Sequence, residues 1–133
     1  MDFKITARYV GDDYVELTHE NTGSKIMTDL PPDNGGRGRT FSPTDLFAAA
    51  NASCVLSIMQ KFAAREAINL IGSSIEIQKI MAENPRRVAR FILDVKLPKG
   101  ITELQREKLL ACVKACPLGR SLHPEIEVEV RAD

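Results

Sequence analysis

The sequence has no excess of charge of either sign, since 18 lysines and arginines balance 18 aspartates and glutamates among its 133 residues. Proteins that bind nucleic acid or an anionic membrane by general electrostatic attraction carry a basic stripe, so we expect neither partner. No run of 18 or more apolar residues is free of polar interruption, and we therefore expect no transmembrane span. The N-terminal segment also lacks the layout of a signal peptide. These absences predict a cytoplasmic protein.

The sequence is also poor in metal ligands, with three cysteines and two histidines. The spacing of Cys54, Cys112, Cys116 and His123 matches none of the compact structural zinc patterns. The glycine-rich segment 35–38 lacks the Gly-Lys-Ser/Thr ending of a phosphate-binding loop. We therefore expect no metal ion and no cofactor. In a cytosolic chain, cysteines are more often free or redox-active thiols than a disulfide framework.

Hydrophobic periodicity predicts an α+β fold in a single domain covering residues 1–133. The expected elements are, in chain order, strands within 3–9, 14–20 and 25–30, a helix over 43–69, strands over 75–80 and 88–97, a helix from 102 to 116, and a strand over 123–130. The order is βββ-α-ββ-α-β. No internal repeat and no low-complexity segment interrupts it.

The long helix has a clear start signal. Ser42 is suited to the N-cap, Pro43 to the first helical position, and Asp45 to the third, in a variant of the capping box. The alanine-rich interior that follows favours a helix and permits close approach of other backbones. The preceding loop, residues 31–41, is rich in glycine and proline, and such loops often carry binding sites.

Two cysteines in different contexts are the main candidates for chemistry. Cys54 lies in the alanine-rich helix, and Cys116 ends the second helical run just before a proline. Each alone is more often a small buried apolar residue than a nucleophile. If the fold brings them together, they form a dithiol that can pass through a sulfenic acid to a disulfide. A nearby arginine, Arg37 or Arg39 of the loop, could stabilise the Cys54 thiolate, although both could equally be solvated loop residues.

With this element order, the segments Ser42-Pro-Thr-Asp-Leu-Phe-Ala-Ala-Ala-Asn-Ala-Ser-Cys54 and Cys116-Pro117 resemble those of the OsmC/Ohr superfamily of osmotically inducible and organic hydroperoxide resistance proteins. The resemblance covers essentially the whole chain. It implies antiparallel sheets wrapped around a long central helix, in an intertwined homodimer with active sites at the subunit interface. No metal or cofactor is implied.

The resemblance further implies an antioxidant peroxidase that acts on organic hydroperoxides. Cys54 would become a sulfenic acid, Cys116 would condense with it to a disulfide, and a dithiol, possibly a dihydrolipoyl protein, would reduce that disulfide. Family members use an arginine and a glutamate to activate the first cysteine. Arg37 and Arg39 are the candidates for the arginine. Thr44 occupies the position of the glutamate, and the acid stands one residue later, as Asp45.

These departures leave two other functions open. One is an OsmC-like stress protein that holds an apolar ligand in the dimer-interface pocket with little or no peroxidase turnover, for which the presence of Thr44 is the main support. The other is a purely structural dimer, which we would favour if Cys54 and Cys116 were buried and far apart.

Overall fold

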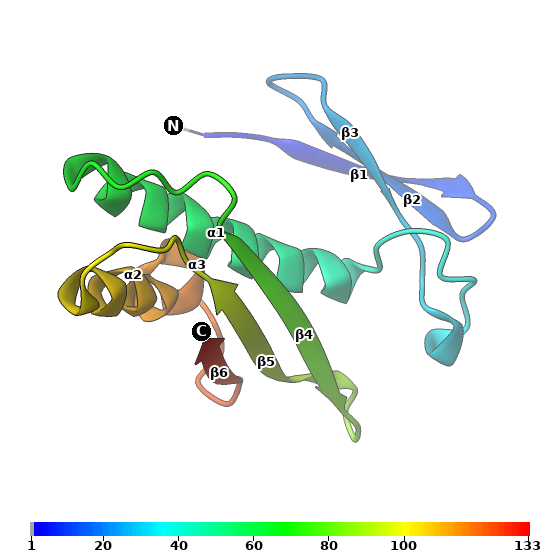
Figure 1. The fold of residues 1–133 in the computed structure, drawn as a ribbon. Coiled ribbons are helices and arrows are strands. Elements are labelled where there is room, and N and C mark those ends of the chain that lie inside the picture. Colours follow the sequence, from blue (N-terminus) through cyan, green and yellow to red (C-terminus); the bar gives the residue numbers. More distant parts are fainter. Residues whose placement is uncertain (1) are drawn as a thin grey trace. The chain divides into compact units, whose positions relative to one another are not determined.

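The structure is a computed structural model that describes residues 2–133. Contacts group the chain into two compact units, Met1–Leu46 and Phe47–Asp133. The elements are β1 (Ile5–Gly11), β2 (Tyr14–His19), β3 (Lys25–Thr28), η1 (Pro32–Asn34), α1 (Pro43–Arg65), β4 (Ser74–Ala82), β5 (Arg87–Lys96), α2 (Glu103–Ala115), α3 (Pro117–Arg120) and β6 (Glu127–Ala132) (Figure 1). The predicted α+β class and the order of strands and long helices are confirmed, and α3 is an additional short helix.

The first unit contains a three-stranded antiparallel sheet in the order β1-β2-β3. Its first hairpin turns at Gly11, Asp12 and Asp13, all of which have positive φ angles of 53–94°. Glycine adopts this conformation freely and aspartate tolerates it better than most residues, which explains the Gly-Asp-Asp sequence at this turn. The turn carries Asp12, whose carboxylate contacts Arg37 and Arg39.

One face of this sheet is apolar and exposed. Cross-strand pairs place Ile5 opposite His19, Tyr9 opposite Val15, and Leu17 opposite both Ala7 and Ile26, so these side chains share a face. Ile5 is 69% exposed and Tyr9 67% exposed. A hollow of about 240 Å³ opens between Ile5, Leu17, His19, Ser24 and Ile26. Such an exposed apolar face is unusual for a sheet that has no partner.

The second unit holds a core formed by α1, α2 and β5. Val55 and Met59 of α1, Phe91 and Leu93 of β5, and Leu109 of α2 are all fully buried and belong to one cluster. The spacing of Val55 and Met59 explains their burial, because residues four positions apart lie on the same face of a helix. This packing fixes α1 against the sheet and thereby determines which way its cysteine points.

The sheet of the second unit has the order β4-β5-β6, and one strand pair departs from the predicted antiparallel arrangement. β4 and β5 pair antiparallel, whereas β5 and β6 pair in parallel, with Phe91 opposite Val128. Parallel neighbours need a long crossover between them, and the segment containing α2 and α3 supplies it. The alternating pattern of the last strand does not distinguish the two pairings, because both place every second side chain on the same face.

Helix α1 ends at Arg65, four residues before the predicted end at Asn69. The cause is Ala67, which adopts a left-handed φ of 53° and stops the helix. The amide N–H of Ile68 donates to the carbonyl of Ala63 across this stop. Alanine rarely takes this conformation, so nothing in the sequence marks the position as a helix end.

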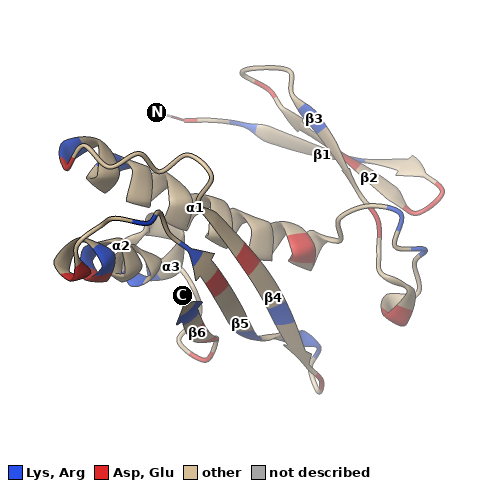
Figure 2. Ribbon diagram, viewed as in Figure 1, with Lys and Arg blue, Asp and Glu red and all other residues tan. Residues whose placement is uncertain are grey.

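By length and composition alone, α1 could cross a membrane, since an 18-residue window has a mean hydropathy of 1.3. The charged residues of α1 lie only near its ends, as Asp45, Lys61 and Arg65, and Figure 2 shows the middle of the helix without charge. A third of the window is buried within the structure. Core helices pass the same length and hydropathy test, and Val55 and Met59 give α1 a packed core face.

Candidate thiol site

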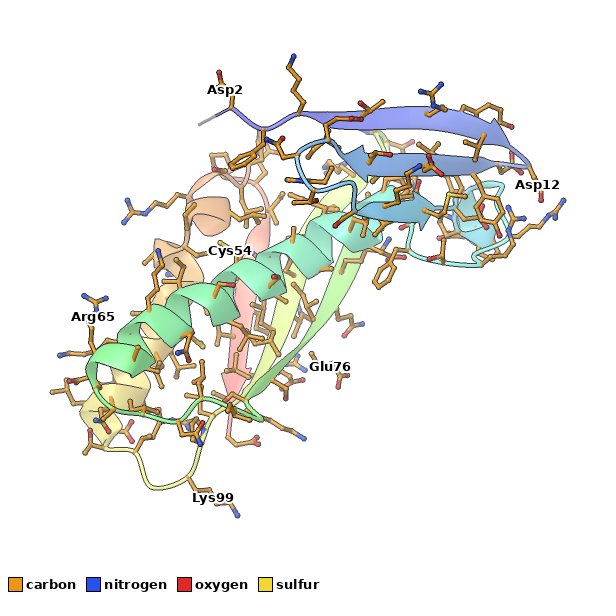
Figure 3. The ribbon with its side chains drawn as sticks, turned by 90° about the horizontal axis from the view of Figure 1, so that it is seen from above. Asp2, Asp12, Cys54, Arg65, Glu76 and Lys99 are labelled. Carbon is orange, nitrogen blue, oxygen red and sulfur yellow. The ribbon has the colours of Figure 1, made fainter. Side chains whose placement is uncertain are left out.

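Cys54 lies near the middle of α1, on the flank of the helix beside its buried face. It is half-buried, while its neighbour Val55 is fully buried and Ser53 is exposed. Figure 3 shows Cys54 on the side of α1 that faces the α2–α3 segment. Cys54 is a free thiol. The position gives the sulfur both solvent access and a fixed direction, because the helix is anchored by its core face.

Cys116 lies at the junction of α2 and α3 and is fully buried. Its extended backbone, with φ −67° and ψ 150°, ends α2 and lets Pro117 begin α3. The thiol donates to the carbonyl of Val113 at 3.7 Å, and the sulfur accepts from the amide N–H of Gly119 at 3.2 Å. The sulfur is thus held by backbone groups.

Gly119 makes this arrangement possible because it has no side chain. A Cβ there would lie 2.6 Å from the carbonyl oxygen of Val113 and 3.2 Å from the sulfur of Cys116. Sequence reasoning overlooked Gly119, and the only available signal was a glycine three residues after Cys116 within a short helical turn.

Cys54 and Cys116 interact directly, although the sequence separates them by most of the second unit. Burial raises the pKa of the Cys116 thiol above its ordinary value; a hydrogen bond and Coulombic interaction with the Cys54 side chain raise it further, while the Gly119 amide opposes the rise. The side chains of Cys54 and Cys116 are therefore close enough to influence each other. One thiol is accessible and the other is buried, and both are free.

The third cysteine, Cys112, is buried one helical turn before Cys116. Its thiol donates to the carbonyl of Lys108 at 3.6 Å, and burial, followed by Coulombic interaction with Cys116, raises its pKa. Cys112 packs in the core cluster.

Asn51 is a polar residue next to the thiols that sequence reasoning overlooked. It precedes Cys54 by one turn of α1 and is 1% exposed. Neither its Nδ2 nor its Oδ1 has a hydrogen-bond partner among residues 2–133. Leaving a buried polar group unsatisfied costs about 1–3 kcal/mol. The only sequence signal is a single amide in a run of alanines.

Arg39, one of the predicted activating arginines, is held by the first unit itself. Its Nε donates to Asp29 at 2.7 Å, its Nη1 to the Asp12 carboxylate at 2.8 Å and its Nη2 to the Asp12 carbonyl at 2.6 Å. The guanidinium also stacks on Tyr14, 3.9 Å from the ring centroid. The hydrogen bond from Arg39 lowers the pKa of the buried Asp29 to about 2. Arg39 thus fastens the glycine-rich loop to the sheet.

Arg37 is less constrained. Its Nη2 lies 3.2 Å from Asp12, and both side chains are mostly exposed, Arg37 at 63%. Exposed pairs of this kind contribute little to stability, so Arg37 can change partners at small cost. Arg37 and Arg39 belong to the first unit and Cys54 to the second, and the action of either arginine on Cys54 stays a prediction.

The start of α1 has the predicted capping arrangement. The amide N–H of Asp45 donates to the Ser42 hydroxyl at 3.0 Å, and the amide N–H of Ser42 donates to the Asp45 carboxylate at 2.9 Å. The Thr44 hydroxyl lies 3.3 Å from that of Ser42. Asp45 therefore caps the start of the helix, and its assignment to the catalytic site stays a prediction.

Within residues 2–133, no group of three or more histidine, cysteine, aspartate and glutamate side chains is arranged to hold a metal ion. The chemistry that this arrangement can perform is that of a dithiol. Its components are a reachable thiol on α1, a buried thiol at the α2–α3 junction and an unpaired amide one turn from the first.

Comparison with known proteins assigns the family. The model of the OsmC-like protein family matches residues 35–131. A candidate osmotic stress induced and detoxification response protein from Psychrobacter arcticus 273-4 is 32% identical, with a TM-score of 0.92 over 97% of this chain and 94% of that one. The chain therefore belongs to the OsmC-like family.

Two more distant structures show the same fold. An organic hydroperoxide resistance protein OsmC from Legionella pneumophila is 20% identical, with a TM-score of 0.81 over 100% of this chain and 97% of that one. The organic hydroperoxide resistance protein OhrB of Bacillus subtilis is also 20% identical, with a TM-score of 0.73 over 100% and 98%. Among curated protein sequences, none is significantly similar to this chain.

From the Asp29–Arg39 ion pair we expect a contribution to the free energy of unfolding that disappears at acid pH. Because the folded-state pKa of Asp29 is about 2 and its ordinary value is 3.8, the stabilisation is complete above about pH 4 and is lost as the pH falls through about 2. Asp29→Asn should be less stable than the parent protein near neutral pH, and the difference should shrink between about pH 4 and about pH 2. Urea unfolding of both proteins across this range measures it; a constant difference would contradict the assignment.

Proposed function

We propose that this protein is a cysteine-based peroxidase that reduces organic hydroperoxides. The observation that carries the proposal is the pairing of a half-buried Cys54 with a fully buried Cys116, both free thiols in direct interaction. Relatives named for organic hydroperoxide resistance support the same substrate class. Partly buried apolar residues of α1, among them Phe47 and Ile58, pack against the same core cluster as Cys54, and such surroundings suit an organic peroxide.

The proposed reaction has three balanced steps. The Cys54 thiolate attacks the peroxide, so that an S–O bond forms, the O–O bond breaks, and the alkoxide leaves and takes up a proton as the alcohol. The resulting Cys54 sulfenic acid condenses with the Cys116 thiol, which forms the disulfide and releases water. An external dithiol then attacks the disulfide, is itself oxidised and restores both protein thiols. A dihydrolipoyl protein is the expected reductant.

The burial of Cys116 suits the second step. Over-oxidation competes with disulfide formation, and a resolving thiol already facing the reacting sulfur shortens the life of the sulfenic acid. The Gly119 amide, which donates to the Cys116 sulfur, stabilises the thiolate that attacks. Backbone groups thus hold the resolving thiol without a charged side chain.

Arg37 is the better candidate for activating Cys54. Arg39 already donates to Asp29 and Asp12 through all three guanidinium nitrogens, so little of its charge remains available. Arg37 has a single exposed ion pair that it can exchange. An arginine close to a thiol favours the thiolate, which is the nucleophile.

A homodimer completes the proposal. The apolar face of the β1-β2-β3 sheet leaves Ile5 and Tyr9 two-thirds exposed and encloses a hollow beside Ile26. A sheet buries such a face against another layer, and a second copy of the chain is the partner that the family resemblance implies. In this arrangement, each copy covers the sheet of the other.

The first prediction concerns the cysteines. Cys54→Ser should reduce cumene hydroperoxide turnover with dihydrolipoamide to the rate without protein, because the nucleophile is missing. Cys116→Ser should react once and then proceed to the sulfinic acid, because no thiol resolves the sulfenic acid. Cys112→Ser is the matched control and should keep its activity. Stopped-flow kinetics and mass spectrometry after one equivalent of peroxide measure these outcomes.

In the parent protein, the same mass spectrum should show a peptide link between Cys54 and Cys116. Equal turnover of Cys54→Ser and the parent protein would exclude the peroxidase. If ligand binding at an apolar pocket persists while turnover is absent in the parent, the OsmC-like binding protein is the correct function.

The second prediction separates the arginines. Arg37→Ala should shift the alkylation-versus-pH curve of Cys54 toward higher pH by about one unit or more, because a nearby positive charge is lost. Arg39→Ala should leave this curve in place and lower thermal stability, because it removes the ion pairs with Asp29 and Asp12. Iodoacetamide kinetics across pH measure the first effect. An identical curve in Arg37→Ala would rule out this arginine.

The third prediction tests the dimer. Ile5→Lys places a charge beside the hollow of the apolar face and should produce a monomer in sedimentation velocity at micromolar concentration. Thr6→Lys is the matched control, since the adjacent residue of β1 points to the opposite, polar face and is also exposed. A parent protein that sediments as a monomer, or a dimer that survives in Ile5→Lys, would refute this interface.

A further inference from the structure

The side-chain amide of Asn51 is buried, and the proposed reaction assigns it no role. It is 1% exposed, and both of its polar atoms lack a hydrogen-bond partner among residues 2–133. The residues one turn to either side on its face, Ala48 and Val55, are apolar and buried. Buried amides are nearly always paired, so an unpaired one in an ordered helix points to a partner that arrives during function.

The position of Asn51 identifies that partner. Asn51 and Cys54 are three residues apart on α1, and side chains at this spacing are neighbours with Cβ atoms about 5–6 Å apart. The reduced sulfur is a weak acceptor on a short side chain. An oxygen bonded to that sulfur extends the side chain by one atom and is a much stronger acceptor.

We propose that the Asn51 carboxamide binds the oxygen atom that Cys54 receives from the peroxide. Its Nδ2–H donates to this oxygen as the S–O bond forms and the O–O bond breaks. Once the sulfenic acid has formed, Oδ1 can accept its O–H. The inference rests on the proposed peroxidase function and adds to it a residue that contacts the reacting atoms.

The timing of this hydrogen bond explains how it accelerates the reaction. The amide makes no hydrogen bond to any of the described residues 2–133 in the reduced state, and it gains one as oxygen is transferred to sulfur. An interaction that is stronger in the transition state than in the ground state lowers the barrier. The burial of the amide strengthens it, because a hydrogen bond is electrostatically stronger in surroundings of low dielectric constant.

The proposal differs from a general effect on the thiolate. A group that only stabilised the Cys54 thiolate would change the rates of all electrophiles together. A group that binds the transferred oxygen affects peroxides and leaves alkylation unchanged, because iodoacetamide delivers no oxygen to sulfur. The ratio of the two rates is therefore the informative quantity, and a purely structural role would not change it.

The test compares Asn51→Ala with the parent protein in the reduced state at one pH. The second-order rate of Cys54 oxidation by cumene hydroperoxide should fall about 10- to 100-fold, the range expected for one hydrogen bond to a partly charged oxygen. Alkylation of Cys54 by iodoacetamide should stay within about twofold. Gln60→Leu is the control, because it removes an exposed amide from the same helix, and it should change neither rate.

Alanine favours the helical conformation, so the Asn51→Ala variant should fold. Its thermal unfolding midpoint should equal or exceed that of the parent protein, because the substitution removes a buried amide without a hydrogen-bond partner. Asn51→Leu is the second variant if the alanine protein does not fold. Failure of both to fold would assign the amide a structural role and overturn the inference. So would an unchanged peroxide rate, or peroxide and alkylation rates that fall by the same factor.

The reaction of the parent protein distinguishes a failure of the proposed function from a failure of the role of Asn51. If the parent forms no sulfenic acid or disulfide with cumene hydroperoxide, the proposed function fails and the role of Asn51 fails with it. If the parent reacts and Asn51→Ala reacts equally fast, the peroxidase stands and only the inference about Asn51 is wrong.

Discussion

The packing of α1 on the sheet of the second unit is the constraint on which the thiol site depends. Val55 and Met59 are buried against Phe91 and Leu93, and this contact determines the rotation of the helix about its axis. Because Cys54 directly precedes Val55, the sulfur must lie at the edge of the buried face, where it is partly accessible. The packing of the core thus determines the orientation of Cys54.

The second thiol is positioned by a different principle. Cys116 stands where α2 ends, and its backbone leaves the helical region so that Pro117 can begin α3. The freed amide of Gly119 then donates to the sulfur. Hydrophobic packing orients one cysteine and local backbone geometry orients the other. The first unit adds a third device, in which two carboxylates hold Arg39 on the ring of Tyr14.

Much of this fold can be predicted from the sequence because its signals are local. Alternating residues mark the strands, and the Ser42–Asp45 capping pair marks the start of α1. The end of α1 could not be predicted, since it depends on an alanine at position 67 in a left-handed conformation. The parallel pairing of β6 with β5 could not be predicted either, because the alternation of side chains is the same in both pairings. At the site, the two cysteines were recognised by motif, whereas the contacts of Arg39, Gly119 and Asn51 depend on tertiary structure.

The unequal burial of the three cysteines has a practical consequence for anyone handling the protein. In the folded chain Cys54 is half-buried, whereas Cys112 and Cys116 are buried in the second unit. A thiol reagent should therefore react with one cysteine in the folded protein and with all three only after unfolding. A simple colorimetric count reports whether the second unit is folded, with no engineered label.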